Sequence, residues 1–248
     1  MAGNSARPGV SVTSRVLALL GAFDERHRAL TLTDLARRAD VPVPTAHRLV
    51  RELVAGDALA RRPSGEYVVG RRLWDVGLLA PVEAGLRRVA EPFLHDIHAA
   101  TRATVHLAVR DGDEALYLER MSGRSSVPVV SQIGSTLPLH CTGVGKVLLA
   151  HAPDEVQVRV LGSLPRVTRY TITQPGLLRQ QLTRVRRDGF ATTTEEMSLG
   201  ACSVAVPVWR GDEVVASIGV VVGALKRDRP RLVVALQVAA QGIGRSLR

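Results

Sequence analysis

Residues 31–54, which read TLTDLARRADVPVPTAHRLVRELV, decide the fold of the N-terminal part of the chain. Apolar side chains recur at helical spacing before and after the prolines, so the stretch predicts two helices joined by a short turn. Pro42 disfavours the helical conformation at Val41 and ends the first helix, for which Thr33 is the expected N-cap. Proline is tolerated in the first turn of a helix, so the second helix is expected from residue 44 or 45 to residue 54.

The flanking residues complete a small domain of three helices and a hairpin. Residues 12–23 carry apolar side chains at helical spacing, and residues 58–62 and 66–69 read as two strands around a tight Pro-Ser-Gly turn. Helix, turn, helix and hairpin are the parts of a winged helix-turn-helix, in which the second helix lies in the major groove and the hairpin contacts phosphates. We expect this domain over residues 9–72.

The positive charge of the chain is concentrated in the same segment. The 248 residues include 33 Lys and Arg against 23 Asp and Glu, which gives a net charge of +10. Because 31 of the basic residues are Arg in a sequence rich in Ala, Val and Gly, codon bias alone accounts for such an excess, and the total indicates little. Residues 1–72 have 12 Arg and 7 acidic residues, a net charge of +5, whereas the other +5 is spread over 176 residues. This distribution points to a nucleic-acid surface near the N-terminus.

The candidate DNA contacts lie on the polar face of the second helix and on the hairpin. Side chains at the start of that helix, and the arginines that follow, are placed to reach base edges or phosphates. The alternative is that each arginine belongs only to a solvated helix face. The pattern as a whole favours contact with double-stranded DNA through Pro44, Thr45, His47, Arg48, Arg51, Arg61 and Arg62.

Beyond this domain the sequence predicts a linker helix and then an α+β domain. The linker is expected over residues 73–82, with Pro81 as the boundary, and the second domain over residues 83–248. Strands are expected at 104–109, 115–119, 127–131, 190–194, 203–209 and 214–222, and helices at 92–101, 142–151, 154–161, 174–188 and 229–247. Strands that return as hairpins, with helices on one side, predict a mainly antiparallel sheet.

No motif predicts catalysis, a metal or a cofactor. Residues 143–146, Gly-Val-Gly-Lys, lack the first glycine and the final Ser or Thr of a Walker A loop. Cys141 beside His140 is a weak candidate for a nucleophile and its base, because adjacent residues rarely face one another. Glu195 and Glu196 form either a paired-carboxylate site or, as is commoner, a solvated loop or salt bridges to arginine.

The overall composition is typical of a cytoplasmic globular protein. The longest uncharged apolar run, residues 214–225, is well short of the ~20 residues needed to cross a bilayer, so no membrane association is expected. The first ten residues lack the apolar core of a signal peptide. Two cysteines, Cys141 and Cys202, make neither a disulfide framework nor a four-ligand zinc site unaided.

Four stretches resemble the IclR family of bacterial transcriptional regulators, and together they extend over nearly the full length. They are residues 14–49, 67–73, 137–150 and 189–208, of which 137–150, LPLHCTGVGKVLLA, is the most specific. The resemblance implies a winged helix joined by a helix to a GAF-like effector domain. It also implies a homodimer or dimer of dimers, with palindromic double-stranded operator DNA and a small-molecule effector as partners.

The resemblance further implies where the effector binds. Family members that bind small keto acids have an acidic residue, a cysteine and two serines at four strand positions, where this chain has Thr193, Ser203, Gly219 and Val221. The loss of hydrogen-bond partners favours a larger or more apolar effector, such as an aromatic acid. The effector-binding residues implied by the family are Thr142, Gly143, Val144, Thr193, Ser203, Gly219 and Val221.

These observations favour an effector-responsive transcription factor that is not an enzyme. The alternative is a ligand-binding module or an enzyme that uses the winged helix only for dimerisation. A general nucleoid protein is a third possibility, and it is disfavoured because it has no need of the long segment beyond the linker.

Overall fold

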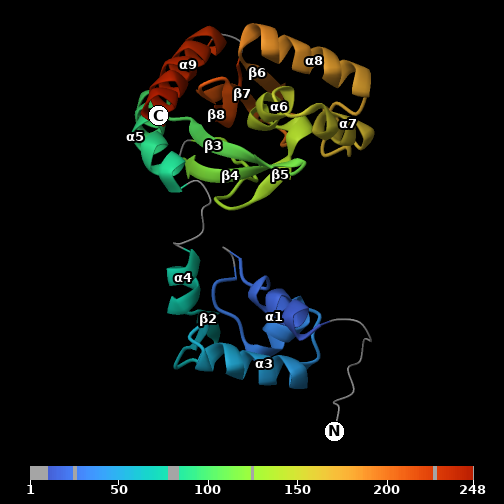
Figure 1. Cartoon of the computed structure of the whole chain (residues 1–248), viewed down its shortest axis with the longest axis vertical. Helices are drawn as coiled ribbons and strands as arrows, with labels where there is room; N and C mark the ends of the chain where they lie inside the picture. The colour runs from blue at the N-terminus through green and yellow to red at the C-terminus, as the bar shows by residue number, and fades with distance from the viewer. Residues whose placement is uncertain (1–10, 25–26, 78–83, 124–125, 226–227, 248) are drawn as a thin grey trace. The chain divides into compact units, whose positions relative to one another are not determined.

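The computed structural model describes residues 11–24, 27–77, 84–123, 126–225 and 228–247, which divide into two units (Figure 1). The first unit spans residues 1–82 and the second spans residues 83–248. Each unit has its own hydrophobic core, which is one cluster of buried side chains in the first unit and two in the second. Pro81, the linker boundary expected from the sequence, lies outside the described residues.

The N-terminal unit is a winged helix-turn-helix, which confirms the fold predicted for it. Its helices enclose a core around Leu19, Leu35 and Leu49. Backbone hydrogen bonds between Leu30 and Tyr67 tie the segment before the second helix to the hairpin. The elements in order are α1 (Val12–Leu20), α2 (Leu32–Arg38), α3 (Val43–Ala55), β1 (Leu59–Arg61), β2 (Tyr67–Val69) and α4 (Arg71–Gly77).

Helix α2 begins two residues earlier than the sequence predicted. Its N-cap is Thr31, whose Oγ1 accepts a hydrogen bond from the backbone N–H of Asp34 at 3.2 Å and donates one to Asp34 Oδ2 at 2.8 Å. The prediction of Thr33 as the cap is therefore wrong. The reciprocal bonds between Thr31 and Asp34 resemble a capping box, and Asp34 also places a negative charge at the positive end of the helix.

Helix α3 is bounded by proline and glycine as expected. Pro42 stands at the N-cap position in an extended conformation, Pro44 lies in the first turn, and Gly56 ends the helix. The helix begins one residue before the predicted range. Its buried stripe consists of Ala46, Leu49 and Val50. Because these residues recur every three or four positions, the opposite face of α3 is left in solvent.

The hairpin leads into α4 through a close backbone contact. A Cβ atom at Gly70 would collide with the backbone of Asp57 and Ala58, so only glycine fits there. The N–H of Gly70 donates to Ala58 O at 2.9 Å, which holds the start of α4 against the end of α3. Helix α4 is described as far as Gly77, and the rest of the linker predicted for residues 73–82 lies outside the described residues.

The second unit is built on an antiparallel sheet whose strands differ in length. Its strand order is β5-β4-β3-β8-β7-β6, and every pairing between described strands is antiparallel, as the sequence predicted. The strands are β3 (Thr104–Asp111), β4 (Glu114–Met121), β5 (Thr136–Pro138), β6 (Ala191–Thr194), β7 (Cys202–Arg210) and β8 (Glu213–Val222).

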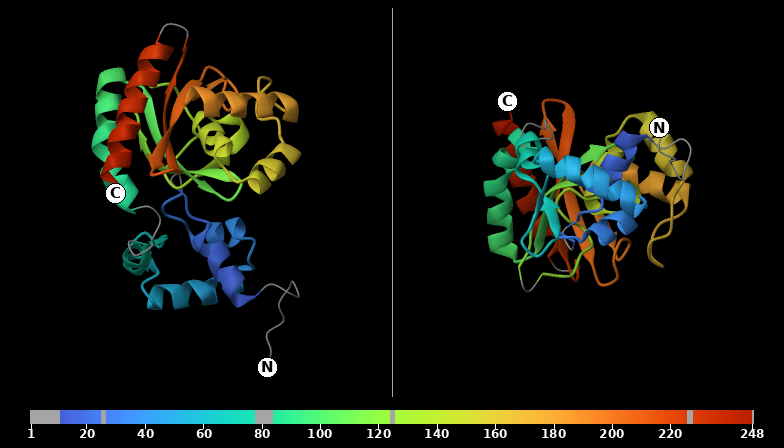
Figure 2. Two further views of the ribbon diagram at one scale, coloured as in Figure 1. Left: turned by 45° about the horizontal axis from the view of Figure 1, so that its top comes forward. Right: turned by 90° about the horizontal axis from the view of Figure 1, so that it is seen from below.

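Helices cover both faces of this sheet (Figure 2), whereas the sequence predicted them on one side. On one face lie α5 (Ala84–Thr101) and α9 (Arg229–Ser246), and on the other lie α6 (Gly143–Ala150), α7 (Asp154–Gly162) and α8 (Pro175–Asp188), with the short 3-10 turn η1 (Leu139–Cys141) before α6. Strand β7 explains the difference, because residues 204–208 are buried in succession and do not alternate. No helix in the described part of the chain is long and apolar enough to cross a membrane.

A further sequence prediction for this unit is wrong. Residues 127–131 do not form a strand: Pro128 has no N–H to donate, and Ser131 bonds to side chains, with its carbonyl accepting from Arg120 Nη1 at 2.9 Å. The strand at this edge of the sheet is β5, which the sequence did not predict. The sequence also predicted helix up to Val89 and again from Pro92, and the structure joins the described part of this stretch in one helix, α5, from Ala84.

Candidate nucleic-acid interface and ligand pocket

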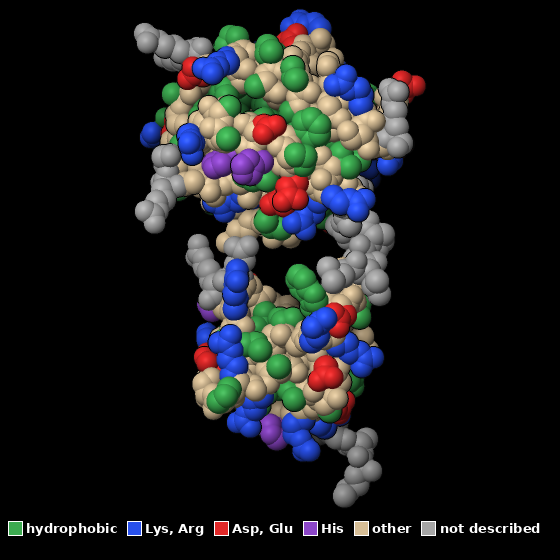
Figure 3. Space-filling model, turned by 90° about the vertical axis from the view of Figure 1, so that its left-hand side faces the viewer, with side chains coloured by type: hydrophobic (Ala, Val, Ile, Leu, Met, Phe, Trp, Pro, Cys, Tyr) green, Lys and Arg blue, Asp and Glu red, His purple; other side chains and the backbone are tan. Residues whose placement is uncertain are grey.

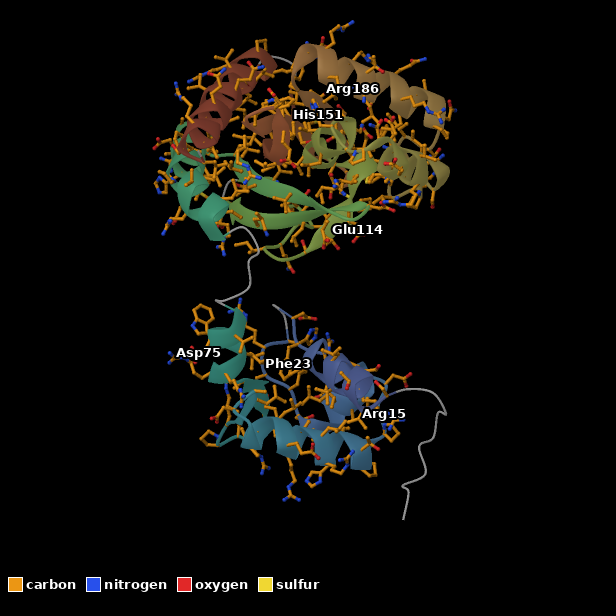
Figure 4. The ribbon with its side chains drawn as sticks, viewed as in Figure 1. Arg15, Phe23, Asp75, Glu114, His151 and Arg186 are labelled. Carbon is orange, nitrogen blue, oxygen red and sulfur yellow. The ribbon has the colours of Figure 1, made fainter. Side chains whose placement is uncertain are left out.

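The solvent face of α3 presents the residues that the sequence predicted to contact DNA. Pro44, His47, Arg48 and Arg51 are exposed, and Thr45 is half-buried. Figure 4 shows side chains tipped with nitrogen projecting from α3 away from the body of its unit. Arg48 Nη1 donates to Glu52 Oε1 at 2.9 Å, one turn along the helix. Exposed pairs of this kind are weak, so a phosphate or a base edge can replace Glu52 as the partner of Arg48.

The hairpin between β1 and β2 presents two more basic side chains. Arg61 and Arg62 are both exposed. The guanidinium of Arg61 lies 5.8 Å from the centre of the Tyr67 ring, which holds that arginine along the hairpin. The turn needs Gly65, whose φ is +88°. Figure 3 shows arginine side chains at the lower end of this unit, where α3 lies, as well as along its sides. The helix and the hairpin therefore offer a basic surface to a polyanion.

A pocket between α6 and the sheet brings together all the residues that the family resemblance assigned to the effector. Its cavity volume is about 50 Å³, and the empty space is about 500 Å³ when the open mouth is counted. The start of α6 and strands β6, β7 and β8 supply these residues. They are Thr142, Gly143, Val144, Thr193, Ser203, Gly219 and Val221.

The floor of the pocket is one face of the sheet. The register places His106 opposite Gly219, Gly219 opposite Ala205, and Ser203 opposite Thr193. Directly opposed residues, and residues two apart on one strand, point to the same face, so this group lies together under α6. A Cβ at Gly219 would lie 2.9 Å from the Cβ of Ala205. The floor is closely packed at this point, and Val144 of α6 also comes within 3.1 Å of the same Cβ position, so only glycine fits there without a shift of its neighbours.

The N-terminus of α6 forms one polar end of the pocket. Thr142 is the N-cap, and its Oγ1 accepts a hydrogen bond from the N–H of Gly145 at 3.1 Å. The N–H groups of Gly143 and Val144 belong to the first turn, where a helix supplies no acceptor of its own. Such groups, together with the helix dipole, favour a carboxylate or another anion.

Two hydroxyl groups stand beside this helix terminus. Thr193 Oγ1 and Ser203 Oγ are 2.5 Å apart, so one donates a hydrogen bond to the other. Ser203 also approaches Gly143 so closely that a Cβ there would lie 2.5 Å from Ser203 Oγ. Glycine at position 143 therefore lets the hydroxyls and the helix terminus face the same part of the pocket. Together they add O–H groups to the N–H donors of α6.

Three residues at the other end of the pocket were missed by the sequence analysis: His106, Tyr117 and Ser131. His106 Nε2 lies 2.8 Å from Ser131 Oγ, and the rings of His106 and Tyr117 meet edge to face with centroids 5.0 Å apart. Burial, with a smaller effect of Arg120, lowers the pKa of His106 to about 3, so the imidazole is neutral. Burial also raises the pKa of Tyr117. The available signal was a lone polar residue, His106, inside an otherwise apolar strand.

The connection between β6 and β7, residues 195–201, forms another wall and is held by a buried ion pair. Its pocket-lining residues are Met197, Ser198 and Ala201. Lys146 Nζ donates to the two carboxylate oxygens of Glu196 at 2.6 and 2.8 Å and to Gln181 Oε1 at 2.7 Å. The side chains of Lys146 and Glu196 are 1% and 6% exposed. Burial lowers the pKa of Lys146 and raises that of Glu196, and in each case the charge of the partner opposes the shift.

The expectation of a solvated loop or an arginine partner is wrong for Glu196. Its carboxylate is buried, and its partner is Lys146. Glu195 accepts a hydrogen bond from the N–H of Gly200 at 2.6 Å, within its own connection, so the two carboxylates have separate partners. The sequence contains only two lysines, which made a lysine partner less obvious than an arginine.

Cys141 and His140 are not arranged as a nucleophile and its base. The thiol of Cys141 is directed at Met197 Sδ, 3.5 Å away, and His140 Nε2 lies 3.0 Å from the carbonyl oxygen of Pro165. Burial, assisted by the charge of Glu196, raises the pKa of the thiol to about 12, which keeps it protonated. Among the described residues, no group of three or more His, Cys, Asp or Glu is placed to hold a metal ion.

Two family models match the chain, one over each unit. Residues 12–63 match the IclR helix-turn-helix domain, and residues 80–245 match the C-terminal domain of the bacterial transcriptional regulator IclR. The first match contains α3 and the second contains the whole of the pocket described above.

Individual relatives are similar over most of their length. The HTH-type transcriptional regulator XynR of Escherichia coli K12 is 30% identical over 209 residues, which cover 82% of this chain and 81% of the relative. The HTH-type transcriptional regulator KdgR of Dickeya chrysanthemi is 30% identical over 226 residues, or 90% and 72% of the two chains. Among solved structures, an IclR homolog from Microbacterium hydrocarbonoxydans complexed with 4-hydroxybenzoate is 35% identical, with a TM-score of 0.90 over 96% of this chain and 99% of the other.

Proposed function

Because the chain belongs to the IclR family of bacterial transcriptional regulators, we propose that an aromatic acid bound in the α6 pocket sets its affinity for operator DNA. The family gives the regulator class, the helix-turn-helix domain and the ligand-binding C-terminal domain. The effector class and the DNA-contacting residues are our proposal. The observation that supports it best is the pocket itself, in which apolar side chains lie beside the donor groups at the start of α6.

The lining of the pocket supports an aromatic acid. Val129, Leu137 and Val144 provide apolar surface for a ring, and the first turn of α6 with Ser203 provides donors for a carboxylate. None of the described residues that line the pocket is Asp or Glu, so an anion meets no like charge there. A relative that was crystallised with 4-hydroxybenzoate adds support to this effector class.

Calorimetry with the purified full chain tests the effector class. Benzoate and 4-hydroxybenzoate are expected to bind at least about tenfold more tightly than pyruvate or glyoxylate, because a buried ring adds apolar contact that the small acids lack. Acetate serves as the control for a carboxylate alone. Tight binding of pyruvate or glyoxylate, with no heat from the aromatic acids, would show that the effector class is wrong.

For the operator, we propose that α3 enters the major groove and that the hairpin contacts the neighbouring phosphates. Two copies of α3 would read the two halves of a palindromic site, as a homodimer or a dimer of dimers. Exposed apolar side chains on the N-terminal unit fit such self-association: Leu17 on α1 and Trp74 on α4 are each 62% exposed.

Effector and operator would be coupled through α4 and the residues that follow it. The effector binds the DNA-bound and the DNA-free conformations of the protein with two different affinities. The ratio of these affinities sets the factor by which the effector changes the affinity for DNA. The sign of that difference decides whether the effector releases the operator or strengthens its binding. Titrating the operator at saturating and zero effector measures the coupling directly.

Arg48→Ala is expected to weaken operator binding by about tenfold, because one side chain that reaches a base edge or phosphate is removed. The slope of log affinity against log salt should fall by about 1 if the lost contact is a phosphate. Fluorescence anisotropy with the DNA upstream of the protein's own gene, at several salt concentrations, measures both effects.

Arg159→Ala is the matched control, since Arg159 is also an exposed arginine in an ion pair, with Asp113, but lies in the second unit. It should bind the operator as the wild type does. If Arg48→Ala matches that control in affinity and salt slope, α3 is not the recognition helix.

A further inference from the structure

The pocket has two polar ends that lie on different strands. His106 is on β3, and Ser203 is on β7, with β8 between them. Neighbouring strands lie about 4.8 Å apart, so the two backbones are separated by roughly 10 Å across the floor. The side chains at both ends reach over that floor into the same pocket. A ligand that touches both ends therefore crosses β8.

The middle of this path is narrow. Gly219 on β8 lies between His106 and Ala205 in the register. Val144 of α6 packs above it, with its Cγ1 3.1 Å from the place where a Cβ of Gly219 would be. The space directly between Gly219 and α6 is therefore occupied by Val144, and a ring that crosses β8 passes beside that side chain.

The two ends differ in the charge that they accept. The start of α6 favours an anion through its N–H groups and dipole. His106 is neutral in its buried setting, so it gives a carboxylate no countercharge. His106 and Ser131 use one donor and one acceptor in the hydrogen bond between them, which leaves at least one donor and one acceptor for a further partner. This end therefore suits an uncharged group that hydrogen-bonds, such as a hydroxyl.

We propose that His106 and Ser131 form a second anchor, which selects aromatic acids that carry a hydroxyl across the ring from the carboxylate. The inference rests on the proposed function, because it assumes that an aromatic acid occupies the pocket with its carboxylate at α6. It adds two specificity-determining residues to the positions that the family resemblance implies. Neither residue lies in α6 or in strands β6 to β8.

The chain offers a matched control for the histidine. His151 lies just beyond the C-terminal end of α6 (Figure 4), where its ring meets Trp209 edge to face at 5.0 Å. It does not line the pocket among the described residues. His151→Phe therefore tests the loss of a partly buried imidazole elsewhere in the same unit.

The experiment is calorimetry of the full chain with benzoate, 3-hydroxybenzoate and 4-hydroxybenzoate at neutral pH. The wild type and His151→Phe are expected to prefer 4-hydroxybenzoate over benzoate by at least about fivefold, as one hydrogen bond to the ligand provides. In Ser131→Ala and in His106→Phe this preference should shrink to within about twofold.

The outcomes separate the inference from the proposed function. If the wild type binds benzoate and 4-hydroxybenzoate equally, or if Ser131→Ala keeps the full preference, the second anchor is wrong while the aromatic effector stands. A stronger preference for 3-hydroxybenzoate also overturns it, because the hydroxyl would then not lie across the ring. If none of these acids binds, the proposed effector class fails and the anchor fails with it. Ser131→Ala removes one oxygen, so the test holds even where His106→Phe does not fold.

Discussion

Lys146→Met is expected to lower the free energy of unfolding by about 3–5 kcal/mol, because it leaves the carboxylate of Glu196 buried without its cation. Gln181 loses its bond to the ammonium group as well. The wall formed by residues 195–201 should loosen with this change, since Glu196 lies in it. Urea denaturation of the full chain, followed by far-UV circular dichroism, measures the loss.

Two further variants make this result specific. In Lys146→Met/Glu196→Leu no buried charge is left alone, so most of the lost stability should return. Arg159→Met breaks the exposed ion pair with Asp113 and should change stability little. A Lys146→Met protein that is as stable as Arg159→Met would show that Glu196 finds another partner or reaches water.

Gly219→Val is expected to weaken binding of the aromatic acid by about 10- to 100-fold, because the new side chain displaces residues that line the pocket. Its Cβ would lie 2.9 Å from Ala205 Cβ and 3.1 Å from Val144 Cγ1, so β7 and the start of α6 must shift to make room for it. The effector-free variant should still bind the operator, since α3 and the hairpin belong to the other unit.

Gly223→Val is the matched control at the end of the same strand. A Cβ at Gly223 has its nearest neighbour, Val127 Cγ2, 3.8 Å away, which is an ordinary contact. Calorimetry should find wild-type affinity for the effector in this variant. Equal affinities in Gly219→Val and Gly223→Val would mean that the ligand does not lie over β8.

The N-terminal unit was predictable because its signals are local. Prolines at 42 and 44 and a glycine at 56 bound α3, and the apolar spacing within it fixes which face is buried. The cap of α2 was misplaced by two residues, although Thr31 and Asp34 are three positions apart, which is the spacing of a capping box and favoured Thr31. Local patterns therefore located each helix and strand of this unit to within a few residues but did not fix its first and last residues.

The second unit was predictable in most of its strands, apart from β5, but not in its layers or its pocket. Pairs such as Lys146 and Glu196, or His106 and Ser131, are 50 and 25 positions apart in the chain, so no spacing rule brings them together. The pocket residues were named from the family resemblance and not from periodicity. The end of the pocket at His106 was missed because it depends on how an irregular segment, around Ser131, returns to β3.

The buried ammonium of Lys146 gives the protein a built-in chemical reporter. The chain has only two lysines, so amine-reactive reagents meet few targets in it, and Lys146 is 1% exposed. Reagent can acylate that amine only when residues 195–201 swing away from α6, because the carboxylate of Glu196 and the amide of Gln181 enclose it. The rate at which Lys146 is modified therefore measures how often residues 195–201 open locally, independently of the global unfolding of the chain. If the ligand holds this wall closed, Lys146 is modified more slowly as the ligand concentration rises. The rate of modification then measures the occupancy of the pocket, and neither molecule needs a label.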